Sequence, residues 1–365
     1  MLKAAITTLS FLASASMASA GSLNYFVTNL VSDQPGVAQI TDPSLVNAWG
    51  ISASSTSPFW VSDNGTGVST LYRVVGGVVS KVGLTVSIPG DGSVTGQLFN
   101  PGAAGGAFNG DNFLFSSEDG TISGWRGSLG TTAETLVAGS SANVYKGVTY
   151  GATGGFSYGY AANFRAGTID VLKGSAGAPT LAGSFVDPTL PAGYAPFNVE
   201  NINGTLYVTY ALQDSTKHDE IDGPGDGFVS TFDLNGNFLG RLASNGPLDA
   251  PWGLALAPST WGTFAGDLLV GNFGDGSIDV FNPANGMFLG SLTDSSGAPL
   301  SIDGLWGLDF GNGKNGDVNA LYFSAGPDGE SHGLFGAIAP VPEPGAWLLL
   351  TGGIGMLWLV RRRAV

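Results

Sequence analysis

A short pattern recurs six times along the chain at intervals of about 50 residues. Each copy is a glycine followed by a run of residues that favour β-strands, and the glycines are Gly67, Gly120, Gly167, Gly227, Gly276 and Gly333. Repeats of this length bury their apolar faces against one another, as in solenoids and propellers. Each repeat has room for four short antiparallel strands, which is the blade of a β-propeller. The sequence therefore predicts an all-β, six-bladed β-propeller.

The remaining strands can be placed around this pattern. The first strand of several repeats opens on Trp-Gly, at Trp49, Trp252 and Trp306, and we interpret these tryptophans as core residues between neighbouring blades. The sixth repeat lacks a fourth strand, since Pro340 follows almost at once, whereas residues 25–31 form a spare strand at the N-terminus. We expect this strand to close the ring and cover an open sheet edge. A seventh, degenerate blade and an open β-solenoid are the alternatives.

Composition narrows the class of protein. Glycine accounts for 59 of 365 residues, charged residues for 11% and apolar residues for 43%, which suits short strands joined by tight turns. The absence of cysteine excludes disulfides, zinc-thiolate sites and a cysteine nucleophile. The formal net charge is −15, and no basic footprint for nucleic acid is present. We interpret the excess of acidic residues as favouring solubility. Affinity for cations is the functional alternative.

The N-terminus has the features of a secretory signal peptide. Lys3 gives a positive start, residues 4–17 are small and apolar, and Ala18 and Ala20 flank an A-x-A cleavage site. We expect cleavage after Ala20. Residues 1–20 are therefore predicted to be removed, and the protein to be exported through the general secretion machinery.

The C-terminus carries a second processing pattern in three parts. Pro342, Glu343 and Pro344 precede an uncharged apolar run over residues 345–360, slightly shorter than the ~20 residues of a membrane-spanning helix. Three arginines follow, namely Arg361, Arg362 and Arg363. Clustered positive charge stays on the cytoplasmic side, while the two prolines hold the backbone extended.

These three parts resemble the PEP-CTERM sorting signal of Gram-negative bacteria. The resemblance implies processing by the membrane protease-transpeptidase exosortase, transient anchoring in the inner membrane, and delivery to the cell surface or the extracellular space. It also implies an association with exopolysaccharide production. The predicted organisation is a signal peptide over 1–20, a propeller over 21–339 and a sorting segment over 340–365. An ordinary single-span anchor is the alternative.

Polar residues end several of the second strands, where a propeller places ligands at the mouth of its channel. The candidates are Asp63 with Asn64, Ser117 with Glu118, Asn163 and Asn272. Brought together by the ring, Asp63, Asn64, Asn163 and Asn272 would offer oxygen ligands suited to Ca²⁺. This resembles, in position only, the calcium-centred lactonases and arylesterases of the six-bladed class. The alternative is that Asp and Asn end strands because they favour turns.

A long insertion in the fourth repeat is the second candidate site. Residues 214–226 hold five carboxylates and one of two histidines, and the candidates are His218, Asp219, Glu220 and Asp222. Loops longer than their repeat requires are often functional. The insertion and the Trp-Gly repeats resemble a largely uncharacterised family of exported bacterial propellers, for which no activity is implied. A solvated acidic loop is the alternative.

No compact catalytic motif is present. The sequence around Ser157 matches G-x-S-x-G, but it is followed by strand residues rather than by the helix of a nucleophile elbow. We therefore predict a non-enzymatic binding or scaffold module for extracellular polysaccharide or a partner protein. The alternative is a Ca²⁺-dependent hydrolase or lyase that uses Asp63, Asn163 and Asn272.

Overall fold

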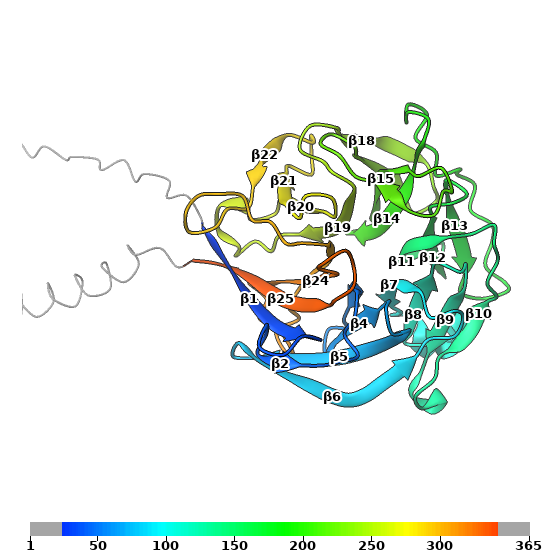
Figure 1. Cartoon of the computed structure of the whole chain (residues 1–365). Helices are drawn as coiled ribbons and strands as arrows, with labels where there is room; N and C mark the ends of the chain where they lie inside the picture. The colour runs from blue at the N-terminus through cyan, green and yellow to red at the C-terminus, as the bar shows by residue number, and fades with distance from the viewer. Residues whose placement is uncertain (1–23, 342–365) are drawn as a thin grey trace, which may run out of the picture. The chain divides into compact units, whose positions relative to one another are not determined.

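The computed structural model describes residues 24–341, which form a ring of six β-sheets (Figure 1). The expected signal peptide and the sorting motif, Pro342 to Pro344 with Arg361 to Arg363, lie outside the described residues and stay predictions. In residues 24–341, no helix is long and apolar enough to cross a membrane. The prediction of an all-β, six-bladed propeller is confirmed.

Blades one to three follow one another along the chain. Blade one consists of β3 (Ala48–Ser52), β4 (Phe59–Asp63), β5 (Val68–Val75) and β6 (Val78–Ser87). Blade two consists of β7 (Val94–Phe99), β8 (Phe113–Ser117), β9 (Ile122–Trp125) and β10 (Glu134–Val137). Blade three consists of β11 (Tyr145–Thr153), β12 (Phe156–Asn163) and β13 (Thr168–Lys173).

Blades four to six complete the ring. Blade four consists of β14 (Tyr194–Ile202), β15 (Thr205–Gln213), β17 (Phe228–Asp233) and β18 (Phe238–Ser244), and β16 (Glu220–Ile221) pairs with β15. Blade five consists of β19 (Pro251–Leu256), β20 (Leu268–Asn272), β21 (Ile278–Phe281) and β22 (Phe288–Ser291). Blade six consists of β23 (Leu305–Phe310), β24 (Leu321–Ala325), β25 (Leu334–Pro340), β1 (Tyr25–Ser32) and β2 (Ile40–Thr41).

The N-terminal strand closes the ring as predicted. β1 pairs antiparallel with β25, from Tyr25 opposite Pro340 to Ser32 opposite Leu334, and the two strands lie side by side in Figure 1. Both ends of the propeller therefore belong to one blade. The pairing covers the edge that β25 would otherwise expose.

Blade three departs from the expected four strands. After β13 the chain contains Pro179 and Pro188, whose nitrogens cannot donate to a ladder. The intervening segment bonds to blade four instead, through Gly183 N to Asn235 O (2.8 Å) and Phe185 N to Gly236 O (3.0 Å). The prediction of a fourth strand is therefore wrong for this blade.

Glycines on the inner strands bring the blades into backbone contact. A Cβ on Gly50 would lie 2.7 Å from Thr95 O, and one on Gly307 would lie 2.8 Å from Trp49 O. Gly96, Gly147 and Gly253 are equally crowded against the next inner strand, each with a backbone atom within 3 Å. The glycine of each Trp-Gly pair is therefore what allows neighbouring inner strands to touch.

The tryptophans of these pairs gather at the centre of the ring. Trp49 stacks on Trp306 with ring centroids 3.8 Å apart, and Trp252 meets Trp306 edge-on at 5.9 Å. Phe197 and Phe273 complete this apolar cluster. The interpretation of the tryptophans as core is confirmed, but they pack on one another as well as between blades.

The inner-strand contact generates a stability prediction. We expect Gly307→Ala to lower the free energy of unfolding by about 2 kcal/mol, because overpacking a core typically costs 1–3 kcal/mol. Urea denaturation followed by tryptophan fluorescence measures the change. Gly83→Ala in β6 is the matched control, since nothing lies within 4 Å of the added Cβ. Equal stability of the two variants would contradict the packing role of Gly307.

Candidate functional site

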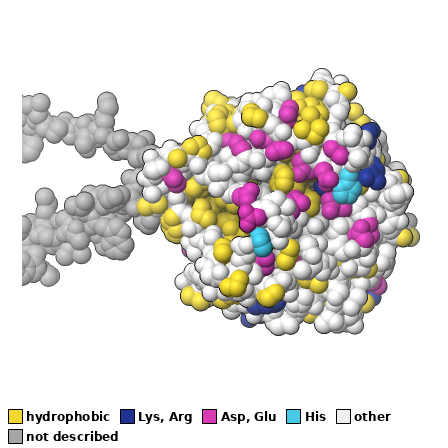
Figure 2. Space-filling model, in the orientation of Figure 1, with side chains coloured by type: hydrophobic (Ala, Val, Ile, Leu, Met, Phe, Trp, Pro, Cys, Tyr) yellow, Lys and Arg dark blue, Asp and Glu magenta, His cyan; other side chains and the backbone are white. Residues whose placement is uncertain are grey.

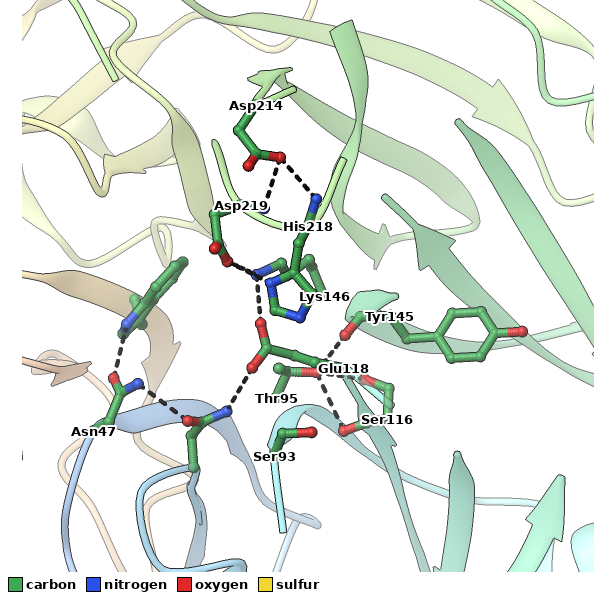
Figure 3. Close-up of polar contacts among 12 residues, drawn as sticks. Asn47, Ser93, Thr95, Ser116, Glu118, Tyr145, Lys146, Asp214, His218 and Asp219 are labelled. Atoms are coloured by element: carbon green, nitrogen blue, oxygen red, sulfur yellow. Dashed lines mark hydrogen bonds and ion pairs between the residues drawn. The ribbon is translucent and has the colours of Figure 1, made fainter. Parts of the chain in front are cut away.

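A buried lysine lies at one end of the central channel. Lys146 is on the inner strand β11, at the level where β3, β19 and β23 carry tryptophan, and is 1% exposed. Its Nζ donates to Glu118 Oε1 at 2.5 Å and lies 3.4 Å from Asp219 Oδ1 (Figure 3). The ammonium also lies 5.0 Å from the centre of the Trp49 ring. The lysine thus joins the apolar centre to a group of carboxylates.

Four carboxyl groups from three blades surround this ammonium. Glu118 follows β8 of blade two, Asp219 and Glu220 belong to the insertion of blade four, and Glu330 precedes β25 of blade six. Burial lowers the pKa of Lys146, but Glu118, Glu220 and Asp219 outweigh this effect and raise it above its ordinary value. Glu118 at the channel end and the insertion, which the sequence predicted as parts of two separate candidates, therefore lie together.

The pKa values of the acids in this cluster are shifted in different directions. Burial, and then the charge of Glu220, raises the pKa of Glu330 to about 7. Burial likewise raises the pKa of Glu220, although Lys146 opposes the shift. For Asp219, burial is outweighed by Lys146 and by the hydrogen bond from His218, so its pKa is lowered. A single lysine cannot balance four carboxylates, and part of the cluster therefore holds protons near neutral pH.

A chain of amides links the carboxylates to the central tryptophans. Trp306 Nε1 donates to Asn47 Oδ1 (3.2 Å), and Asn47 Nδ2 donates to Asn64 Oδ1 (3.3 Å). Asn64 Nδ2 then donates to Glu118 Oε2 at 3.2 Å. The predicted candidates Asn64 and Glu118 are thus brought together, and both oxygens of Glu118 have partners (Figure 3).

The insertion is held over the site by its own first residue. Asp214 Oδ1 accepts the backbone N–H of His218 (2.9 Å), and Asp214 Oδ2 accepts the Thr216 hydroxyl (2.7 Å). Burial acts against these bonds, which nevertheless lower the pKa of Asp214 to about 2. His218 Nδ1 lies 2.8 Å from Asp219 Oδ1. Residues 214–219 of the insertion therefore form a hydrogen-bonded turn.

A polar cavity of about 380 Å³ lies beside the lysine. Its lining side chains all carry hydrogen-bonding groups, and they are Asp91, Ser93, Glu118, Asp119, Ser140, Ser141, Asn143, Arg165 and His218. Figure 2 shows Asp and Glu side chains gathered around the middle of the face turned to the viewer. We call this cavity, with Lys146 and its carboxylates, the polar mouth.

Three of the predicted metal ligands lie elsewhere. Asn163 Nδ2 donates to Asp170 Oδ2, and Asn272 Nδ2 donates to Asp279 Oδ2, each at 2.8 Å and each within its own blade. Asp63 is fully buried in blade one, and burial raises its pKa well above the ordinary value. The Asn163 and Asn272 side chains therefore hold strand ends and turns together, each in its own blade. The structure does not bring them into one crown.

The other singled-out residues also fall outside the polar mouth. Asp222 is exposed and faces Asp249, while His332 Nδ1 lies 2.8 Å from Asp33 Oδ2 beside the ring closure. Ser157 is on β12 and bonds to the Tyr150 hydroxyl (2.9 Å). In residues 24–341, neither histidine has a hydrogen bond to a Ser or Thr hydroxyl.

Sequence reasoning missed Lys146, Glu330 and Arg165. Lys146 could have been found, because Lys146-Gly147 occupies the position of the Trp-Gly pairs and places a charge where its counterparts are apolar. Glu330 had no such indication, since its place at the mouth depends on how blade six meets blade four.

Comparisons with known proteins identify relatives and a fold. The chain is 32% identical over 332 residues to the uncharacterised protein R648 of Acanthamoeba polyphaga mimivirus, covering 86% of this chain and 79% of the relative. It is 31% identical over 327 residues to protein L690 of the same virus, covering 86% and 85%. No protein-family model matches the chain.

Solved structures that resemble the chain include both enzymes and binding proteins. A GH93 α-L-arabinofuranosidase of Fusarium graminearum, in complex with arabinobiose, aligns with a TM-score of 0.52 at 13% identity, covering 87% of this chain and 98% of that one. The nidogen/laminin complex aligns with a TM-score of 0.44 at 14% identity, covering 77% and 85%. At 13% identity, the likeness to the arabinofuranosidase shows the propeller fold alone.

The polar mouth generates a prediction about Lys146. We expect Lys146→Met to cost about 3 kcal/mol of stability, because it leaves Glu118 without its counterion in a largely buried site. Adding Glu118→Gln to this variant should recover part of the loss. Urea denaturation of the single and double variants measures both effects. The control is Lys173→Met, an exposed lysine, and an equal cost for the two lysines would contradict the account.

Proposed function

This chain belongs to the family of the mimivirus proteins R648 and L690, and we propose that it is an exported, non-enzymatic binding module. Its proposed ligand is a saccharide chain of neutral or amino sugars, held in the polar mouth. The signal-like N-terminus and the PEP-CTERM-like tail support a location at the cell envelope or in an extracellular polysaccharide matrix, with exosortase as the processing partner.

The composition of the cavity carries this proposal. Hydroxyl groups on Ser93, Ser140 and Ser141 both donate and accept hydrogen bonds, and Asn143 offers the same pair of functions. A polyhydroxylated ligand needs both kinds of partner at close spacing, which an apolar pocket cannot supply. The cavity volume of about 380 Å³ is enough for one or two sugar rings, as small-molecule sites occupy roughly 300–1,000 Å³.

Charge narrows the class of saccharide. Asp91, Glu118 and Asp119 line the cavity together with a single arginine, Arg165. A uronic-acid chain would be repelled by these carboxylates, because both carry negative charge. A neutral chain is not repelled, and an amino sugar gains an ion pair. The site therefore favours neutral or cationic chains over acidic ones.

The same residues argue against turnover. The carboxylates nearest the centre are already bonded, Glu118 to Lys146 and Asn64, and Asp219 to His218. In the described residues the two histidines bond to carboxylates and not to a Ser or Thr hydroxyl, so the mouth has no Ser–His pair. Binding without chemistry is what this arrangement supports best.

Calorimetry with three tetrasaccharides tests the proposal. We expect the full-length protein to bind a glucose tetramer or a glucosamine tetramer and to bind a uronate tetramer at least tenfold more weakly, because of the like charges in the mouth. His218→Ala should weaken the binding of the first two about tenfold, or 1.4 kcal/mol, by removing a lining group.

The chain provides a matched control in its other histidine. His332→Ala changes a residue outside the mouth and should leave saccharide affinity unchanged. Preferential binding of the uronate tetramer, or equal effects of the two histidine variants, would contradict the proposed site.

A Ca²⁺-dependent hydrolase or lyase is the second candidate, favoured by one observation. Glu118, His218 and Asp219 each offer a ligand atom, and these atoms all lie within 4.8 Å of one another. Against it, the Lys146 ammonium contacts both carboxylates and would repel a cation bound between them.

Thermal unfolding of chelator-treated protein separates the two candidates. The binding-module proposal predicts no rise in Tm on titration with Ca²⁺. A bound metal at 100 times its Kd would add about 2.7 kcal/mol of stability, which a melting curve resolves easily. A rise in Tm that His218→Ala abolishes, with hydrolysis of a lactone or ester, would support the hydrolase instead.

A further inference from the structure

The opposite end of the channel contains a second cavity, independent of the proposed saccharide site. All six inner strands contribute residues to the wall of this cavity, which has a volume of about 430 Å³. The level of inner-strand glycines and tryptophans separates it from the polar mouth, since Gly50 and Trp49 precede Ile51 and Ser52 of its lining. The two ends of one ring therefore present two different environments.

Two carboxyl groups enter this cavity from different blades. Glu200 is on β14 of blade four and Asp309 is on β23 of blade six, and both remain partly exposed. The Thr149 hydroxyl donates to Glu200 Oε1 at 3.3 Å. The lining contains no Lys, Arg or His, so these two carboxyls have no counterion from any of the six strands.

A buried amide in the same lining has an unused acceptor. Gln97 is 6% exposed, and its Nε2 donates to Gly50 O and to Trp60 O, each at 2.7 Å. Its Oε1 is buried and has no hydrogen-bond partner. Buried acceptors are usually paired, so the described residues leave this oxygen of the cavity wall unsatisfied.

Most of the remaining lining residues are apolar, and Ser52, Tyr150 and Asn201 add polar groups to the wall. Leu98, Leu254 and Leu308 line the cavity together with other aliphatic and aromatic side chains. Such a wall offers little to a bare metal ion, which prefers a full shell of oxygen ligands.

We propose that this cavity is a binding site for a small organic cation, an ammonium group carried on an apolar body. Glu200 and Asp309 pair with the ammonium, and the leucines contact the apolar part. Pairing a desolvated cation with carboxylates is strong because it neutralises both partners.

Proton exchange accompanies this binding. Burial, reinforced by the charge of Asp309, raises the pKa of Glu200 to about 8, and burial raises the pKa of Asp309 to about 7. A cation favours the ionised carboxylates. Affinity should therefore increase from pH 5.5 to pH 8.5, and binding near neutral pH should release protons.

Calorimetry with hexylamine, and with hexanol as the uncharged analogue, tests the site. We expect the full-length protein to bind hexylamine at least tenfold more tightly than hexanol at pH 8.5, and this preference to shrink at pH 5.5. Glu200→Gln and Asp309→Asn should each reduce hexylamine affinity about tenfold. Both replacements are nearly isosteric, and melting curves confirm that the variants fold.

The control lies at the other end of the ring. Glu118→Gln removes a carboxylate of the polar mouth and should leave hexylamine affinity unchanged. The proposal would be overturned if hexylamine bound no better than hexanol, or if the folded Glu200→Gln/Asp309→Asn double variant retained wild-type affinity. It would equally be overturned if Glu118→Gln alone abolished binding, which would assign the amine to the mouth. Failure of the amine proposal would leave the saccharide proposal open, because the saccharide is placed at the other end of the ring.

Discussion

Backbone contact between successive inner strands is the constraint on which the rest of this molecule depends. Gly50 packs on blade two, Gly96 on blade three, and Gly307 on blade one, so a side chain at any of these positions would force the blades apart. Blade four has Asn198 at this level, and its Nδ2 donates to Trp252 O (2.8 Å) across to blade five. Contact between neighbouring inner strands is therefore made by glycine in several blades and by asparagine in blade four.

This close approach fixes where the residue before each glycine can go. At that position Trp49, Trp252 and Trp306 turn toward the centre and fill it, with Phe197 beside them. Lys146 occupies the same position in blade three and is buried for the same reason. A buried ammonium is tolerated only where anions compensate for its lost hydration. The carboxylates of blades two, four and six meet this requirement, and the polar mouth is the result.

The fold could be predicted from the sequence because several independent patterns indicated the same architecture. Six glycine-led strands, the Trp-Gly pairs and a spare strand at residues 25–31 all indicate one closed ring, and β1 on β25 confirms the closure. Strand count in blade three was not predictable, since the segment after β13 is diverted by contacts with Gly236 that are remote in sequence.

The site was harder to predict than the fold. Asp and Asn at the ends of second strands look alike in sequence, yet Asn64 reaches the mouth while Asn163 and Asn272 bond inside their blades. The difference is one of side-chain direction, which depends on neighbouring loops. The insertion was a candidate site from its length and carboxylates alone, and its meeting with Lys146 could be seen only in the closed ring.

The most direct test of the account is hydrogen–deuterium exchange of the full-length protein with and without a glucose tetramer. Peptides covering residues 91–93, 140–143 and 214–220 line or cover the polar mouth. The account predicts that exchange slows in these peptides and stays unchanged in the outer strands β6 and β22. Protection confined to the outer strands, or none in the three mouth peptides at saturating saccharide, would contradict it.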